Sequence, residues 1–110
     1  MHHLPCEPCK KGATPVTVDE ITIMLTKLTE WKVLEVDGIN RLSRKFKFSN
    51  FAKAITFTNA VADIAEAEQN HPEILTEWGR VTVTWWTHTI RGLHKNDFIM
   101  AARTSHLLGN

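Results

Sequence analysis

The dipeptide Asp37-Gly38 stands between two runs of residues, 31–36 and 39–48, that are rich in apolar and β-branched side chains. Asp-Gly favours the two-residue turn of a β-hairpin, because that turn needs positive φ at both central residues. The second run alternates apolar residues with charged or polar ones, so one face of its strand is apolar and the other is wet. Its apolar positions are Leu42, Phe46 and Phe48. The chain is therefore predicted to contain an antiparallel sheet that is covered on one face.

A second hairpin is predicted across Trp78-Gly79. Residues 80–88 alternate and are rich in β-branched and aromatic side chains, which is typical of a strand. A shorter strand over residues 74–77 would pair with it. We expect one face of the long strand to carry Val81, Val83, Trp85 and Thr87, and the other to carry Thr82, Thr84, Trp86 and His88.

Helical periodicity indicates three further elements. Thr17 and Glu20 have the spacing of a capping box, in which each side chain bonds the other residue's backbone N–H. Ser49 or Asn50 can cap the second helix. Pro72 prevents that helix from continuing, because proline has no N–H and restricts the residue before it. The predicted helices cover residues 18–29, 51–69 and 97–107.

The element order α-β-β-α-β-β-α predicts an α+β fold: a four-stranded antiparallel sheet with three helices on one face. The second helix should pack on that sheet through an apolar stripe. This stripe comprises Phe51, Ala54, Ile55, Thr58, Val61, Ala62 and Ala65, with Phe57 and Ile64 beside it. Residues 1–15 are expected to form a loose N-terminal arm, and residues 16–110 a single domain.

Charge and hydropathy narrow the class of protein. The formal net charge is +1, with acids and bases interspersed, whereas a nucleic-acid-binding protein needs a basic stripe along the phosphates. No apolar run approaches the roughly 18 residues of a membrane span, and the first residues lack the apolar stretch of a signal peptide. We therefore expect a cytoplasmic protein that binds neither nucleic acid nor a membrane.

Cys6 and Cys9 form a Cys-x-x-Cys pair behind His2 and His3. Such a pair can chelate zinc or cycle as a dithiol, but a zinc site normally shows a second ligand pair, and a redox motif follows a strand. Neither condition is met, so we expect reduced thiols on an accessory arm and no metal site. Glycine-rich phosphate loops, Gly-x-Ser-x-Gly and His-Glu-x-x-His are also missing.

Three histidines stand at the ends of predicted elements: His71 after the second helix, His88 at the end of the fourth strand, and His94 before the third helix. Each alone is more often a surface histidine than a catalytic one. Two of them at the ends of adjacent elements, beside Trp78 and Trp86, suit a site for a flat ring ligand, in which imidazoles transfer protons near neutral pH. His94 is expected to be solvated.

The run from Glu66 to Asp97 resembles the pterin-4a-carbinolamine dehydratases, and especially the bacterial members associated with phenylalanine hydroxylase. The matching positions are Glu66, His71, Pro72, Trp78, His88 and Asp97. The family usually has two adjacent histidines before the proline, and this chain has Asn70 at the first of them. Enzymes of this family remove water from 4a-hydroxytetrahydropterin, which regenerates the quinonoid dihydropterin after aromatic amino-acid hydroxylation.

The resemblance implies roles for individual residues. His71 and His88 would be the acid–base pair, with Asn70 beside them able to bond the substrate but not to donate a proton. Thr87 and Thr89 would hold the amide edge of the pterin. The other residues of the implied binding site are Glu66, Pro72, Trp86 and Asp97. The resemblance implies no cofactor and a homodimer or homotetramer.

Plainer readings stay open. Glu66 could be a surface charge, and Asp97 an acidic residue favoured in the first turn of a helix. Asn70 also favours a second class of function, a binding module that dimerises or regulates another protein and whose active site has decayed. Retention of His71 and His88 favours the enzyme.

Overall fold

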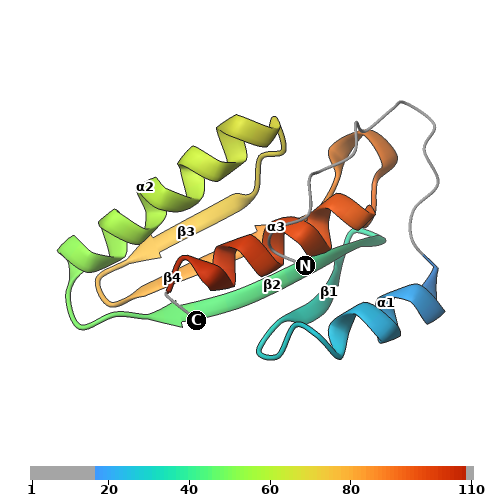
Figure 1. The fold of residues 1–110 in the computed structure, drawn as a ribbon, viewed down its shortest axis with the longest axis horizontal. Helices are drawn as coiled ribbons and strands as arrows, with labels where there is room; N and C mark the ends of the chain where they lie inside the picture. The colour runs from blue at the N-terminus through green and yellow to red at the C-terminus, as the bar shows by residue number, and fades with distance from the viewer. Residues whose placement is uncertain (1–16, 109–110) are drawn as a thin grey trace.

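The computed structural model describes residues 17–108, which form a four-stranded sheet and three α-helices (Figure 1). The elements are α1 (Val18–Leu25), β1 (Lys32–Val36), β2 (Ile39–Lys47), α2 (Phe51–Glu68), β3 (Glu73–Glu77), β4 (Arg80–Trp85) and α3 (Lys95–His106), with a 3₁₀ turn, η1 (His88–Ile90), before α3. This order confirms the predicted α+β fold. The predicted loose arm lies outside the described residues.

The sheet is antiparallel, with the strand order β1-β2-β4-β3. Each hairpin keeps its strands adjacent, and the two hairpins join through β2 and β4, where Leu42 lies opposite Trp85. Asp37 and Gly38 have φ values of 54° and 76°, as the predicted hairpin turn requires. The sheet is open, with β1 and β3 at its edges.

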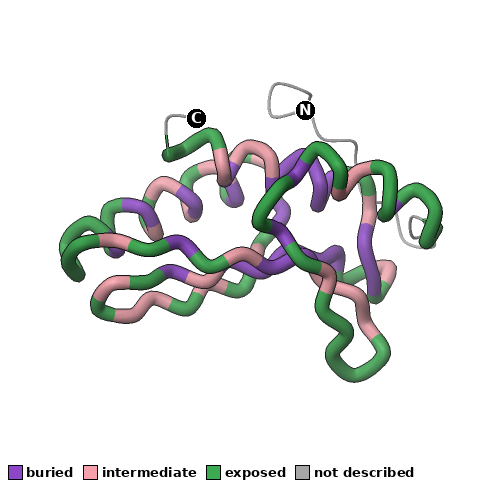
Figure 2. Tube along the Cα trace, turned by 90° about the horizontal axis from the view of Figure 1, so that it is seen from below, coloured by how far each residue is buried: buried purple, intermediate pink, exposed green. Residues whose placement is uncertain are grey.

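Helices α2 and α3 lie side by side on one face of the sheet (Figure 1), and α2 contacts β3 and β4 while α3 contacts β2 and β4. Buried positions concentrate between these two layers (Figure 2). The segment after α1 is tied to α3, because Trp31 is buried and its Nε1 donates to Ser105 Oγ at 2.8 Å. Among residues 17–108, no helix lies on the opposite face of the sheet (Figure 2).

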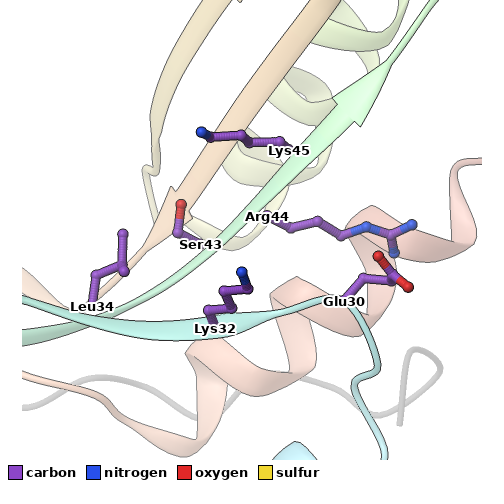
Figure 3. Close-up of a pocket in the computed structure, with 6 residues that line it drawn as sticks. All are labelled: Glu30, Lys32, Leu34, Ser43, Arg44 and Lys45. Atoms are coloured by element: carbon purple, nitrogen blue, oxygen red, sulfur yellow. The ribbon is translucent and has the colours of Figure 1, made fainter.

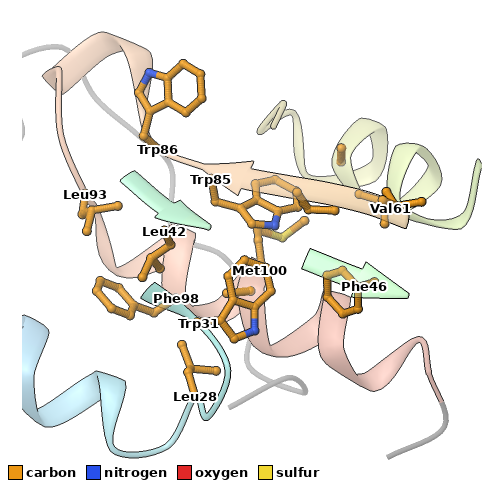
Figure 4. Close-up of a cluster of buried hydrophobic side chains, with 14 of the residues drawn as sticks. Leu28, Trp31, Leu42, Phe46, Val61, Trp85, Trp86, Leu93, Phe98 and Met100 are labelled. Atoms are coloured by element: carbon orange, nitrogen blue, oxygen red, sulfur yellow. The ribbon is translucent and has the colours of Figure 1, made fainter. Parts of the chain in front are cut away.

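The core lies between the sheet and the two helices (Figure 4). Trp85 is fully buried there, and its Nε1 donates to Thr104 Oγ1 at 3.1 Å, which satisfies the one polar atom of the indole. Trp86, by contrast, lies at the margin of the cluster, beyond the end of β4 (Figure 4). The sheet and helices α2 and α3 supply Leu42, Phe46, Val81, Val83, Trp85, Ala54, Phe57, Val61, Phe98 and Met100.

Three predicted boundaries differ from the structure by two residues or more. Helix α1 ends at Leu25 rather than residue 29, because the N–H groups of Thr26, Lys27 and Leu28 bond carbonyls three residues back, which tightens the chain into turns. Helix α3 begins at Lys95 rather than residue 97. Strand β4 ends at Trp85 rather than His88, because Thr87 instead pairs with Gly92 and closes the loop that contains η1.

The predicted stripe of α2 was only partly right. Ala54, Val61 and Ala65 are buried, and so is Phe57, which the prediction placed at the margin. Phe51 and Ile55 are instead 46% and 37% exposed. Buried positions 54, 57, 61 and 65 lie on one face of the helix, which packs on the sheet. Phe51 and Ile55 lie off this face, so their side chains are exposed.

Candidate active site

The start of α3 is fixed by a reciprocal cap between His94 and Asp97. His94 is the N-cap residue, and its Nδ1 accepts from the backbone N–H of Asn96 at 3.0 Å. Asp97 Oδ2 accepts from the backbone N–H of His94 at 2.8 Å. The spacing of these residues equals that of Thr17 and Glu20, which could have indicated the cap from the sequence; we had expected a solvated His94.

Asp97 also bonds two residues from other parts of the chain. Thr87 Oγ1, after β4, donates to Asp97 Oδ2 at 2.8 Å, and Asn70 Nδ2, after α2, donates to Oδ1 at 3.4 Å. The Asp97 side chain is 0% exposed. Burial raises the pKa of its carboxyl from 3.8 to about 6, and hydrogen bonds from His94, Thr87 and Asn70 oppose that rise in part. One buried carboxylate therefore joins three segments.

His71 lies just outside this cluster and pairs with Glu66, since His71 Nε2 and Glu66 Oε1 are 2.7 Å apart and both side chains are exposed. Local structure explains the pair. Gln69, the C-cap residue after α2, has the left-handed conformation with φ 52°, and the Asn70 N–H donates back to the Ala65 carbonyl. This reversal brings His71 back over the last turn of the helix, and Pro72 follows it into β3.

His88 and Trp86 form the second part of the site. Their ring centroids are 4.6 Å apart with an interplanar angle of 43°. The guanidinium carbon of Arg41, in β2, lies 4.0 Å from the centroid of the Trp86 ring, an attractive cation–π distance. His88 and Thr89 are exposed in η1, whereas Trp86 is buried. Sequence reasoning missed Arg41, because its contact follows from the β2–β4 register.

Asp97 and the three residues that bond it, Asn70, Thr87 and His94, are called the Asp97 cluster below. This cluster determines which of the candidate residues lie near one another. Asn70 and Thr87 bond one carboxylate, so their chain neighbours His71 and His88 lie at the same end of the molecule. Trp78 does not join them. It is 70% exposed in the turn at the other end of β3, and a five-residue strand spans roughly 17 Å.

Two surface hollows lie away from these residues. One encloses about 350 Å³ beside the start of β1 (Figure 3), and the other encloses about 470 Å³ at the β3–β4 turn. In Figure 3, Arg44 points toward Glu30, away from Ser43 and Lys45. Glu30, Lys32, Leu34, Ser43, Arg44 and Lys45 line the first, and Lys47, Phe48, Glu77, Trp78, Gly79 and Arg80 line the second. Neither hollow includes a residue of the Asp97 cluster.

Between residues 17 and 108, no three His, Cys, Asp or Glu side chains are grouped so that they could hold a metal ion. No helix in that range is long and apolar enough to cross a membrane. The Cys6–Cys9 pair lies outside it.

These features define a class of protein: a small α+β domain with an open sheet, in which two exposed histidines directly follow residues that bond a buried carboxylate. The chain belongs to the family described as pterin 4 alpha carbinolamine dehydratase, which matches residues 14–107.

Relatives cover almost the whole chain. A protein of Microcystis aeruginosa is 55% identical over 102 residues, which are 93% of this chain and 88% of that protein. A protein of Chlorobium limicola is 50% identical over 107 residues, which are 97% of this chain and 95% of that protein. Both carry the provisional name pterin-4-alpha-carbinolamine dehydratase.

Two solved structures share the fold. A Brucella melitensis protein described as a transcriptional coactivator/pterin dehydratase has a TM-score of 0.78 at 33% identity, covering 86% of this chain and 98% of that chain. A pterin dehydratase-like RuBisCO assembly factor of the α-carboxysome has a TM-score of 0.62 at 24% identity, covering 74% of this chain and 92% of that one. The second likeness concerns the fold alone.

Proposed function

We propose that this chain dehydrates a 4a-hydroxytetrahydropterin to the quinonoid dihydropterin and water, and so recycles the pterin cofactor of aromatic amino-acid hydroxylation. Family membership supports the substrate class. The observation that carries the proposal is that Asn70 and Thr87 both donate hydrogen bonds to the Asp97 carboxylate, an arrangement called the Asp97 tether below. Because His71 follows Asn70 and His88 follows Thr87, both imidazoles lie at one end of the molecule.

The reaction needs one proton delivered to the leaving hydroxyl on carbon 4a and one taken from a ring nitrogen. His71 is the proposed acid. The carboxylate of Glu66 can only accept, so Nε2 of His71 carries the shared hydrogen, and Nδ1 is the nitrogen that would deliver a proton. His88 is the proposed base on the other side of the ring. Neither step requires a metal or a redox cofactor.

The remaining residues would bind and orient the pterin. Trp86, which contacts Arg41 and His88, would supply an aromatic wall. Thr89 would bond the amide edge, and Pro72 would border the ring, whereas the Thr87 hydroxyl donates to Asp97. Asn70 donates its Nδ2–H to Asp97, so its Oδ1 is the atom left to orient the substrate hydroxyl or a water.

The test is a spectroscopic assay of carbinolamine dehydration. His71→Ala and His88→Ala should each lower the rate by at least about 10-fold, the usual value of one positioned acid or base, with the fold intact because both side chains are exposed. His106→Ala, which removes an exposed imidazole from the last turn of α3, is the matched control. Full activity in both site variants would remove the acid–base assignment.

A second candidate function is a dimerising or regulatory binding module, and Asn70 is the observation that favours it. The amide occupies the family's first histidine position and cannot transfer a proton near pH 7. The Brucella relative, described as both coactivator and dehydratase, supports the idea that this fold carries either role. An inactive parent protein would favour this candidate.

A further inference from the structure

The burial of the Asp97 carboxylate costs free energy, and helix capping does not require that burial. Glu20 occupies the same capping position in α1, makes the same reciprocal bonds with Thr17, and is exposed. Asp97 is completely buried, and the groups that favour its ionised form are neutral donors from His94, Thr87 and Asn70. A buried carboxylate without a cation is destabilising. Its burial therefore needs a second explanation.

The hydrogen bonds supply that explanation. Oδ2 of Asp97 accepts from both His94 and Thr87, and Oδ1 accepts from Asn70. Thr87 is followed in the chain by His88, and Asn70 by His71. Each exposed histidine therefore directly follows a buried residue whose side chain bonds the Asp97 carboxylate.

We infer that Asp97 is a positioning residue that sets both imidazoles at once, His71 through Asn70 and His88 through Thr87, and does not itself touch the substrate. The catalytic half of this inference rests on the proposed dehydration. Burial supports the indirect role, since Asp97, Asn70 and Thr87 are all buried whereas His71 and His88 are exposed. Misplacement of a catalytic group by about 1 Å can cost roughly 100-fold in rate.

Two nearly isosteric substitutions test the tether. Thr87→Val removes one donor. Asp97→Asn keeps the shape but turns an amide N–H₂ toward a neighbouring donor. Each should lower kcat by about 10-fold or more, while KM stays within about twofold of the parent. The double variant should lower kcat no further than the more impaired single variant does, because both substitutions disrupt the same hydrogen-bond network.

Glu20→Gln is the matched control, because it makes the same acid-to-amide change at the same capping position of a different helix. It should leave kcat and KM unchanged. A KM that rises in Asp97→Asn with kcat unchanged would make Asp97 a substrate contact and overturn the inference, and so would unchanged kinetics in both site variants.

A second measurement needs no activity. The imidazole Cε1–H signals of His71 and His88, followed by NMR over a pH titration, should both shift or broaden in Asp97→Asn and remain as in the parent in Glu20→Gln. An inactive parent would remove the proposed function and leave this readout to decide the tether. Unaltered signals of both histidines in Asp97→Asn would overturn the inference.

Discussion

Asn70 bonds Asp97 at a position where the family usually has a histidine, which could make the same bond and also transfer protons. Its Nδ2 donates to Asp97 at 3.4 Å, and the residue is only 9% exposed. An imidazole could make the same donation through a ring N–H, and in addition it titrates near neutral pH, which an amide does not. Asn70 can therefore hold the tether without adding a proton-transfer group beside His71.

Asn70→His should restore the missing group. We expect the dehydration rate to rise by about 10-fold or more, and the pH–rate profile to gain an ionisation at roughly 6–7. Asn59→His, on the exposed side of α2, is the control and should change neither. An active parent with unaltered rate and profile would mean that position 70 takes no part in proton transfer. An inactive parent that the substitution does not restore would favour the binding module.

Asp97 should make stability depend on pH in the direction opposite to that of a salt-bridged aspartate. Its pKa is about 6 in the folded chain against 3.8 ordinarily, so the folded state binds the proton more tightly. Stability from this group is complete below pH 3.8 and is lost as the pH rises through 6. The asparagine of Asp97→Asn has no such dependence.

The free energy of unfolding should therefore differ between Asp97→Asn and the parent by an amount that changes with pH. Relative to the parent, the variant should gain about 2 kcal/mol between pH 4.5 and pH 8. Urea unfolding of both proteins at the two pH values measures this change, and the comparison cancels the histidines that both share. A difference that is constant with pH would show that Asp97 does not titrate in this range.

Among the elements, the β3–β4 hairpin is locked to the end of β2 at its turn. The N–H of Phe48 donates to the Gly79 carbonyl at 2.9 Å. A Cβ at Gly79 would meet the Phe48 carbonyl oxygen at 2.9 Å, closer than side chains normally approach backbone. The two backbones must therefore separate before any side chain fits at position 79.

Gly79→Ala should destabilise the chain by about 1–3 kcal/mol, because the obstacle is backbone and not a flexible side chain. Trp78→Ala, at the neighbouring and largely exposed position, is the control and should change stability by about 0.5 kcal/mol or less. Thermal or urea unfolding measures both. Equal stabilities of Gly79→Ala and the parent would show that the two backbones can separate at little cost.

At the scale of the whole molecule, the open sheet leaves β1 and β3 as edge strands, and no helix of the described residues covers its second face (Figure 2). Trp86 is only 9% exposed and contacts Arg41 and His88, so it offers little apolar surface for association. Exposed apolar side chains occur elsewhere instead: Leu34, Val36 and Leu75 in strands, and Phe51 and Ile55 in α2. Such residues and edges favour association.

We therefore predict a homo-oligomer, either a dimer or a dimer of dimers. Light scattering at micromolar concentration should give a mass of at least twice the 12.5 kDa of one chain. The mass of a single chain would contradict this prediction. The hydrogen bonds of Asp97 with Asn70, Thr87 and His94 all form within one chain.

The sequence alone determined the element types and their order, because the signals for them are local. Asp37-Gly38 specifies a turn through its own backbone, alternation specifies a strand through the two-residue period, and Thr17 with Glu20 specifies a helix start within four residues. His71 and His88 stood out as candidates because each ends a predicted element. These signals need no knowledge of which segments meet in space.

Only the tertiary structure decided what those candidates contact. Asp97 could have been an ordinary exposed acid near a helix start, as Glu20 is, and its burial depends on how α3 packs against the sheet and α2. The contact of Arg41 with Trp86 depends on the β2–β4 register, and the loop of His88 depends on the Thr87 bonds to Gly92 and Asp97. Such contacts join residues that are far apart in the chain, so local sequence patterns cannot predict them.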